Sequence, residues 1–210
     1  MQVAAPGTTL ILRAGTHRLS RPLTIHQSLT LVGDGRKSTR VACSSPGYVM
    51  RVEGDGRFAA RDVTFTHEGA QGAHVVEVQC GEIDLRRCSF LGGVHDKVAK
   101  TGGVGLSLLG QVRGMVAGCE TSGNGLHGIS VQGQAQPTLQ RNTCRANKDI
   151  GIFFSGSATG LARDNVCADN GTFGIAVGGQ AQPILQRNTC RANRAGTIVF
   201  LSSGGERTTR

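Results

Sequence analysis

The protein has 210 residues, a formal net charge of +9 and a mean hydropathy of −0.13. This length is enough for one domain, and the lack of a long apolar run excludes a membrane-spanning segment. The 32 glycines and the single Tyr, with no Trp, are typical of a turn-rich repeat chain rather than a conventional β-sandwich. No compact Lys/Arg run is interleaved with aromatic residues, which argues against nucleic acid as a partner.

The chain begins with short apolar runs that alternate with polar residues, the first at Leu10–Leu12. Gly, Asn and Asp separate the runs, and no stretch has a helical apolar period with caps. This pattern of period two predicts short strands joined by turns. We expect residues 1–103 to form irregular coils with longer loops.

From residue 104 to residue 201 the sequence repeats every 23 residues. Segment 133–147 (GQAQPTLQRNTCRAN) returns at 179–193 with one change. The same step is kept by Ile129, Ile152, Ile175 and Ile198, by Cys144, Cys167 and Cys190, by Asn142, Asn165 and Asn188, and by Asn147, Asn170 and Asn193. A fixed period of this size is typical of stacked repeats. Residues 202–210 are expected to form a polar tail.

Each repeat holds about three short strands and three turns. One coil cannot bury its own apolar face, but coils stacked ~4.8 Å apart bury all of them in one core. We therefore predict an all-β, single-domain parallel β-helix of roughly seven to eight coils. In it, residue i lies above residue i+23.

The repeat columns predict which side chains point into the core. The isoleucines should point inward, followed two positions on by Val131, Phe154, Val177 and Phe200, and preceded one coil earlier by Leu106 and Leu108. The cysteines should pack as small hydrophobic groups. The asparagines are expected to adopt left-handed turn conformations and to bond through their amides to the coils above and below. Arg141, Asp164 and Arg187 should form an exposed ladder of alternating charge.

Repeats such as LQRNTCRANKDIGIFF and LARDNVCADNGTFGIAV resemble the right-handed parallel β-helix repeats of the pectin-lyase-like superfamily. Within it they are similar to the carbohydrate-binding and sugar-hydrolase type of domain. The opening, GTTLILRAGTHRLSRPLTIHQSLTLVGDG, resembles the usual start of such helices, so the likeness covers nearly the whole chain. It implies the fold rather than one function, because this fold hosts lyases, hydrolases, esterases, epimerases and non-catalytic binders.

In pectin-lyase-like enzymes the substrate lies along the outer face of one sheet, which the resemblance equates with the sheet containing Ile129. Its outward columns should be Arg51, Glu77, Ser107, Ser130, Phe153, Ala176 and Val199, and Glu53, Gln79, Leu109, Gln132, Ser155, Gly178 and Leu201. The C-terminal half of this face is small and nearly uncharged, so it lacks an acid–base pair. Phe153 is either an exposed platform for a sugar or partner, or a residue of opposite phase or under a loop.

The N-terminal half of the same face is the best candidate site. Two segments, 66–74 (THEGAQGAH) and 92–103 (GGVHDKVAKTGG), are expected to overhang it. The acid–base candidates are Asp96, Glu77, His95 and His74. The ligand-binding candidates are Arg51, Glu53, Glu77, Gln79, His67, His95, Lys97 and Phe153. The alternative is that the histidines bond to backbone and that Asp96, Lys97 and Lys100 belong to a solvated loop.

Residues 58–96, with FAARDVTF followed by RRCSFLGGVHD, resemble part of the pectin methylesterases. By this likeness Asp96 would take the general-acid position. The next coil, GLSLLGQV, lacks the nucleophilic Asp that this family requires, and no matching Arg follows. An esterase without its nucleophile should be inactive. Acid clusters for Ca²⁺ are not visible either, and we expect no metal and no cofactor.

Seven cysteines without a CxxC or zinc-type spacing are expected to be reduced thiols. Reduced core thiols and the lack of a visible secretory signal favour the cytoplasm. The two ends show no capping segment, so either a longer polypeptide or end-to-end association between chains is expected.

Three functions remain open from the sequence. The first is a non-catalytic recognition or scaffold module that presents a flat face to a glycan or a protein, as part of a larger assembly. The alternative is a carbohydrate-active enzyme, a lyase, hydrolase or esterase, that acts on acidic polysaccharide. In it Glu77, Asp96 and a loop histidine would supply acid and base, and Arg51 would neutralise a uronate. The third is a self-assembling structural protein.

Overall fold

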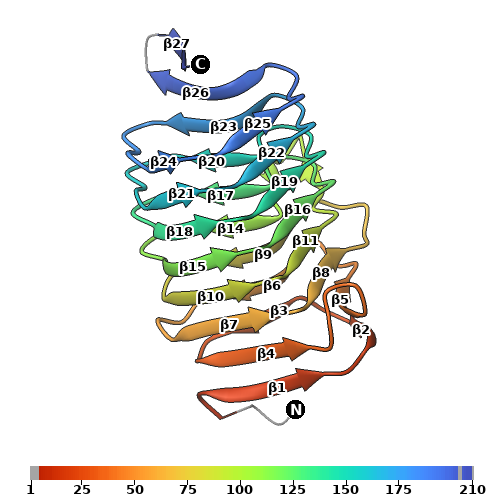
Figure 1. The fold of residues 1–210 in the computed structure, drawn as a ribbon. Helices are drawn as coiled ribbons and strands as arrows, with labels where there is room; N and C mark the ends of the chain where they lie inside the picture. Colours follow the sequence, from red (N-terminus) through yellow and green to blue (C-terminus); the bar gives the residue numbers. More distant parts are fainter. Residues whose placement is uncertain (1–4, 203–204, 210) are drawn as a thin grey trace.

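The computed structural model describes residues 5–202 and 205–209. The chain winds into eight stacked coils, and each coil gives one strand to each of three sheets, A, B and C (Figure 1). The predicted all-β parallel β-helix and its coil number are confirmed. In the described part of the chain, no helix is long and apolar enough to cross a membrane.

The three sheets run the length of the helix. Sheet A contains β1 (Thr8–Leu12), β4 (Leu29–Gly33), β7 (Arg57–Arg61), β10 (Glu82–Arg86), β15 (Arg113–Ala117), β18 (Gln136–Gln140), β21 (Leu161–Arg163) and β24 (Ile184–Gln186). Sheet B contains β2 (Gly15–Leu19), β5 (Thr39–Cys43), β8 (Thr64–His67), β11 (Ser89–Leu91), β16 (Glu120–Ser122), β19 (Thr143–Arg145), β22 (Val166–Ala168) and β25 (Thr189–Arg191). Sheet C contains β3 (Leu23–Ile25), β6 (Gly47–Val52), β9 (Ala73–Val78), β14 (Leu106–Leu108), β17 (Ile129–Val131), β20 (Ile152–Phe154), β23 (Phe173–Gly178), β26 (Gly196–Ser202) and β27 (Gly205–Thr209).

Two elements depart from simple parallel winding. Strands β12 (His95–Asp96) and β13 (Thr101–Gly102) form an antiparallel hairpin inserted between β11 and β14. Strand β27 pairs antiparallel with β26, so residues within the predicted polar tail contribute a strand to sheet C. By pairing with β26, β27 covers a strand edge whose backbone groups would otherwise lack partners.

The coils differ in length between the two halves. In sheet A the paired residues Thr8, Leu29, Phe58, Ile83 and Gly114 give successive steps of 21, 29, 25 and 31 residues. The later pairs, from Gly114 to Pro137 and from Thr138 through Leu161 to Ile184, all step by 23 residues. The regular spacing of the sequence therefore becomes regular strand register.

The core is built from the predicted inward columns. Ile129, Ile152 and Ile175 pair in register and are fully buried. In the last coil Ile198 is half-buried, and Phe200 is exposed because no further parallel coil covers its column. Each fully buried aliphatic side chain contributes about 1.5–3 kcal/mol to folding.

The inner column of sheet B changes character along the helix. Phe65 and Phe90 stack with ring centroids 5.7 Å apart, and in the later coils Cys144 and Cys167 take the same inward position. The predicted thiol column is confirmed, and all seven cysteines are free.

The asparagines form the predicted ladders of buried hydrogen bonds. Asn165 donates through Nδ2 to Leu139 O at 3.0 Å and to Asn188 Oδ1 at 2.9 Å. Its own Oδ1 accepts from the backbone N–H of Asn142 at 2.9 Å. The second ladder also includes Asn124, whose Nδ2 donates to Asn147 Oδ1 at 2.9 Å. The ladders therefore satisfy buried backbone groups at each turn.

The expectation that the asparagines themselves are left-handed is wrong. Positive φ angles occur at the residues just before them, such as Arg141 (53°) and Asp164 (56°). The asparagine is then aimed inward, where its amide reaches the next coil. Of the expected charge ladder, Asp164 and Arg187 form an ion pair at 2.8 Å.

Candidate functional site

The outer face of sheet C carries the predicted outward column. Arg51 pairs in register with Glu77, Glu77 with Ser107, and Ser130 with Phe153. The column continues through Ala176 to Val199. The phase derived from the repeats is therefore right along the whole sheet.

The C-terminal half of this face is not the flat, open surface expected from its small residues. Ser130, Ala176 and Val199 point outward, yet all three are fully buried. A second, small apolar layer lies on this face and consists of Ile150, Phe153, Phe173, Ala176, Val199 and Leu201. Phe153 belongs to the same column as the small residues, whereas Ile150, Phe173 and Leu201 come from columns that flank it. Phe153 is accordingly half-buried rather than exposed.

The charged groups at the N-terminal end of the face form one connected set. Arg51 Nε lies 2.8 Å from Glu77 Oε1, and Arg51 Nη1 lies 3.5 Å from Glu53 Oε1. The guanidinium also covers the ring of Tyr48, 4.0 Å from its centroid. Glu77 is 6% exposed and accepts a hydrogen bond from Gln79 Nε2 at 3.0 Å. Arg51 is therefore committed to two carboxylates of the protein itself.

Three histidines lie beside this charged set. Burial lowers the pKa of His74, and the carboxylate of Glu77, with Oε2 3.9 Å from His74 Nε2, opposes the shift. Burial also lowers the pKa of His127 to about 4. The charge of His95, from β12, lowers the pKa of both. His74 and His127 are therefore neutral imidazoles at neutral pH.

His127 joins the charged end of the face to its apolar end. Its ring centroid lies 5.0 Å from that of Phe153, and its Nδ1 lies 3.5 Å from Asp149 Oδ2. Asp149 also accepts a hydrogen bond from Thr172 Oγ1 at 2.6 Å. Asp149 thus adds a further carboxylate to the site, three coils beyond Glu77.

Tyr48, His127 and Asp149 were not among the residues predicted from the sequence. The signal for His127 was present, because a step of 23 residues leads from Phe173 through Ile150 to His127. Each of these residues stands just before a glycine at the N-terminal end of a sheet C strand. No repeat signal marks Tyr48, which lies in the irregular half.

Two predicted site residues are engaged elsewhere. His67 is 4% exposed at the end of β8 in sheet B, and its Nε2 donates to Ser45 O at 3.1 Å. The segment that begins at residue 66 therefore starts as a strand and not as an overhanging loop. Asp96 Oδ1 accepts the backbone N–H groups of Val98 and Ala99, both at 2.9 Å, which closes the turn of the β12–β13 hairpin.

The hairpin lies beside a polar cavity of about 600 Å³. Its lining consists of Pro46, Gly47, Ala70, Gln71, Gly72, Val94, His95, Asp96 and Thr101. Glu77 does not belong to this lining, so Asp96 and Glu77 do not face one cavity. Lys97 is exposed at the hairpin tip, next to Val98, which is 94% exposed.

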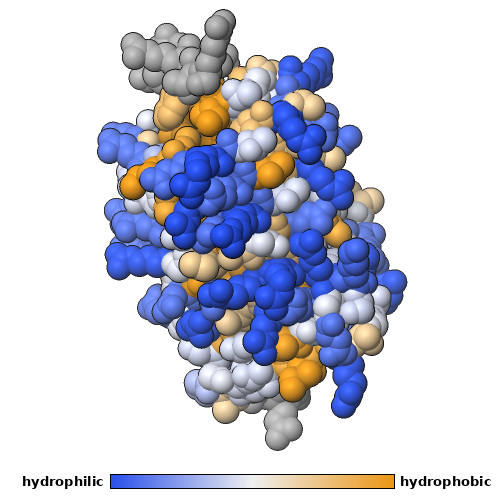
Figure 2. All heavy atoms as spheres, in the orientation of Figure 1, coloured by the Kyte–Doolittle hydropathy of each residue, from blue (hydrophilic) through white to orange (hydrophobic). Residues whose placement is uncertain are grey.

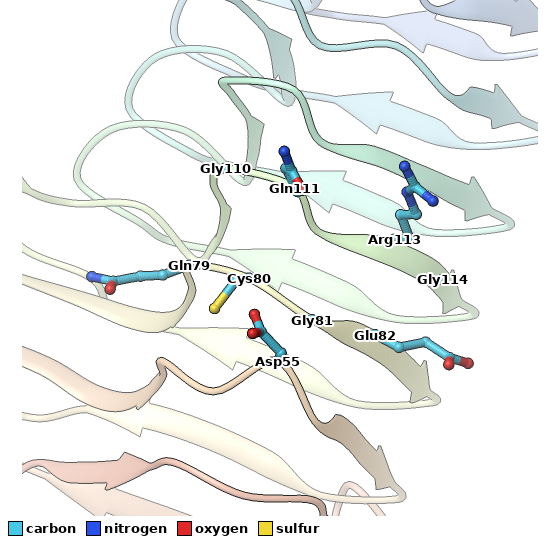
Figure 3. A pocket seen from close by; sticks show the side chains of 9 residues that line it. All are labelled: Asp55, Gln79, Cys80, Gly81, Glu82, Gly110, Gln111, Arg113 and Gly114. Atoms are coloured by element: carbon cyan, nitrogen blue, oxygen red, sulfur yellow. The ribbon is translucent and has the colours of Figure 1, made fainter.

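A second hollow, of about 800 Å³, opens at the turns between sheets C and A. It is lined by Asp55, Gln79, Cys80, Gly81, Glu82, Gly110, Gln111, Arg113 and Gly114 (Figure 3). The Asp55 carboxylate points toward the Cys80 thiol, whereas Gln79 and Glu82 point away. Cys80 Sγ donates to Glu53 O at 2.9 Å, and burial together with Asp55 raises the thiol pKa. A thiol held protonated is a poor nucleophile, so we assign no reaction to this hollow.

A family model described as a right-handed beta helix region matches residues 76–209. The chain belongs to the right-handed β-helix family. No curated protein matches the sequence of this right-handed β-helix. The expected resemblance to pectin-lyase-like helices is confirmed at the level of the fold.

Solved structures share the fold of this right-handed β-helix at low sequence identity. Pectate lyase Pel9A superposes with a TM-score of 0.66 and 16% identity, over 87% of this chain and 54% of its own. The Dettilon tailspike protein superposes with a TM-score of 0.68 and 16% identity, over 97% of this chain and 42% of its own. The pectin methylesterase from Aspergillus niger superposes with a TM-score of 0.53 and 14% identity, over 94% of this chain and 77% of its own. The chain thus spans about half the length of the first two, and the likeness shows the fold alone.

Proposed function

We propose that the protein is a non-catalytic recognition module that binds a glycan along the outer face of sheet C. The observation that carries this proposal is the state of Glu77. This carboxylate is 6% exposed and lies 2.8 Å from Arg51 Nε. General acid–base catalysis needs a group that can exchange a proton with the substrate. Glu77 instead acts as a structural anion that holds Arg51 over Tyr48.

The middle of the face offers the groups that a sugar needs. Phe153 presents part of its ring beside His127, and aromatic rings of this kind stack on the apolar faces of sugars. The neighbouring column supplies amide and hydroxyl groups from Gln132 and Ser155, and Gln132 Nε2 is held by Ser130 Oγ at 2.8 Å. A few placed polar groups around an apolar platform are typical of ligand sites.

The ligand of this face is an uncharged glycan in our proposal. The cation expected to neutralise a uronate, Arg51, is already paired with Glu53 and Glu77. The structural neighbours named for pectate and pectin support a carbohydrate ligand in general.

The alternative function is a carbohydrate-active enzyme that acts on acidic polysaccharide. One observation favours it: Glu77 Oε2 lies 3.9 Å from His74 Nε2, in a half-buried setting that perturbs the histidine pKa. Such pairs occur at catalytic sites. The reaction would then depend on Glu77.

A panel of neutral and acidic polysaccharides separates the two functions when binding and product release are measured in the same samples. We expect binding without product, and about tenfold weaker binding of the neutral polysaccharides in F153A because its stacking is lost. The control is I184A, which removes an apolar side chain that is 59% exposed on sheet A. Unchanged binding of the neutral polysaccharides by a folded F153A contradicts the proposal. Product release that disappears in E77Q establishes the enzyme instead.

A further inference from the structure

The net positive charge of the chain lies away from the proposed glycan face. We define the A–B ridge as the corner from the last residue of each sheet A strand to the second residue of the following sheet B strand. Its cations are Arg13, Arg36, Lys37, Arg40, Arg61, Arg86, Arg87, Arg141, Arg163 and Arg187. Its carboxylates are Asp34, Asp62, Glu120 and Asp164. Ten cations against four anions account for most of the +9 of the whole chain.

The ridge holds two similar clusters, and the first surrounds Asp62. Arg87 donates to both carboxylate oxygens of Asp62, at 2.7 and 2.6 Å. This hydrogen bonding lowers the pKa of Asp62, and the charges of Arg61 and Arg36 lower it further. One carboxylate thus lies among three guanidinium groups, and two positive charges remain uncompensated.

The second cluster repeats this arrangement around Asp164, four coils further along. Arg187 donates to its two oxygens at 2.8 and 3.1 Å. The charges of Arg163 and Arg141 also act on Asp164 and lower its pKa after the Arg187 hydrogen bond. Within the described residues, neither Arg61 nor Arg141 has a carboxylate within ion-pair distance. Both are exposed.

A gap between the two clusters gives a ligand room to lie along the ridge. The turn residue between Arg87 and Arg141 is Gly118, where an added Cβ would meet only Arg87 Cγ, at 3.8 Å. Arg36 reaches across to this point and donates to Gly118 O at 3.2 Å. A cavity of about 380 Å³ results, lined by Gly35, Arg36, Lys37, Ser38, Asp62, Arg87 and Gly118. Figure 2 shows hydrophilic side chains gathered over the middle of the face to which the ridge belongs.

We propose that the A–B ridge binds a linear anionic polysaccharide through its carboxylate or sulfate groups. Guanidinium groups hold such anions with two parallel hydrogen bonds, as Arg87 already does with Asp62. Every coil except that of Gly118 places at least one of these cations on the ridge, at ~4.8 Å per coil, so an extended polymer would meet cations on both sides of that gap. This second site is separate from the glycan face of sheet C.

Nucleic acid fits the ridge less well. Binding of single strands relies on exposed aromatic side chains for base stacking. The aromatic residues within the ridge, Phe65 and Phe90, are fully buried. Phosphates along one strand of a duplex recur every ~3.4 Å, which is out of step with the coils.

The test compares K37Q/R61Q/R141Q with the control K97Q/K100Q/K148Q, in which three exposed lysines off the ridge are neutralised. The probes are polygalacturonate, dextran sulfate, neutral dextran and duplex DNA, titrated at low and moderate salt. We expect both acidic polysaccharides to bind, with affinity falling as salt rises. The ridge variant should bind them about tenfold more weakly, as for the loss of three exposed ion pairs. The control variant should bind like the wild type.

Several outcomes would overturn the proposal. One is that neither acidic polysaccharide binds at low salt. Another is that the control variant loses as much affinity as the ridge variant. A third is that DNA binds more tightly than both acidic polysaccharides. The F153A variant keeps the two sites distinguishable. If F153A weakens binding of the acidic polysaccharides, they occupy the face of sheet C and not the ridge.

Discussion

The irregular coils before residue 104 and the regular coils after it stack in the same way but are held by different side chains. In the regular half, Asn142 and Asn165 fill the turns after β18 and β21 and bond to the next coil. In the irregular half the equivalent positions are Val63 and Cys88, which are buried apolar side chains. A ladder of directional bonds requires one fixed step, whereas apolar packing does not. The irregular half is therefore where coil length varies and where the β12–β13 insertion lies.

The largest expected effect tests whether the asparagine ladder stabilises the fold more than apolar packing does at the same turn position. The N165A substitution leaves the buried Asn142 N–H and Leu139 O without partners. Each unpaired buried group costs about 1–3 kcal/mol, so we expect a total loss of about 3 kcal/mol or more. The matched change C88A removes packing and the weak hydrogen bond from Cys88 Sγ to Arg86 O, and should cost about 1–2 kcal/mol. Urea unfolding measures the loss of unfolding free energy in both variants. Equal losses would show that the ladder stabilises the fold no more than apolar packing does.

The second prediction concerns His127, where the two halves meet on sheet C. Burial lowers its pKa from 6.5 to about 4, so the folded state resists the proton that the unfolded state accepts. This contribution to stability is fully present above pH 6.5 and is lost as the pH falls through about 4. The shift corresponds to about 3 kcal/mol.

The H127I variant places in this column the residue type that the next coil has at Ile150. We expect its unfolding free energy to change less between neutral pH and pH 4 than that of the wild type. If the unfolding free energy of H127I falls with pH as steeply as that of the wild type, other groups cause the acid sensitivity.

The smallest expected effect concerns the inserted hairpin. Asp96 Oδ1 accepts two backbone N–H groups within its own turn, and this turn is exposed. The D96A substitution should cost about 1 kcal/mol and leave glycan binding unchanged. Thermal unfolding and a polysaccharide titration on the same variant check both points. A loss of binding or of turnover in D96A would instead return Asp96 to the catalytic role that the methylesterase likeness implies.

The sequence predicted the fold and the face of the candidate site well because both follow from period alone. A 23-residue step fixes which residue lies above which, and alternation within each strand fixes which side it faces. Arg51, Glu77 and Phe153 therefore occupy one outward column, as expected. The same step would have found His127 and Asn124.

The period of the sequence does not determine how side chains of different coils cover one another. Ser130 and Ala176 point outward as expected, but larger residues from neighbouring columns and coils cover this face. His67 was expected in a loop and instead ends a strand of sheet B, where it bonds to Ser45. These outcomes depend on side chains that are distant in sequence and have no shared period.

The sequence by itself determined the stacking of this protein, since each repeat has an apolar face that only another repeat can bury. It also determined that Asn142, Asn165 and Asn188 bond from coil to coil. Only the tertiary structure decided that Arg51 is bound by Glu53 and Glu77, and that Arg61 and Arg141 lie on the A–B ridge beside carboxylates paired with other arginines. The reason is physical: burial depends on backbone period, whereas pairing of charges depends on which long side chains reach one another in space.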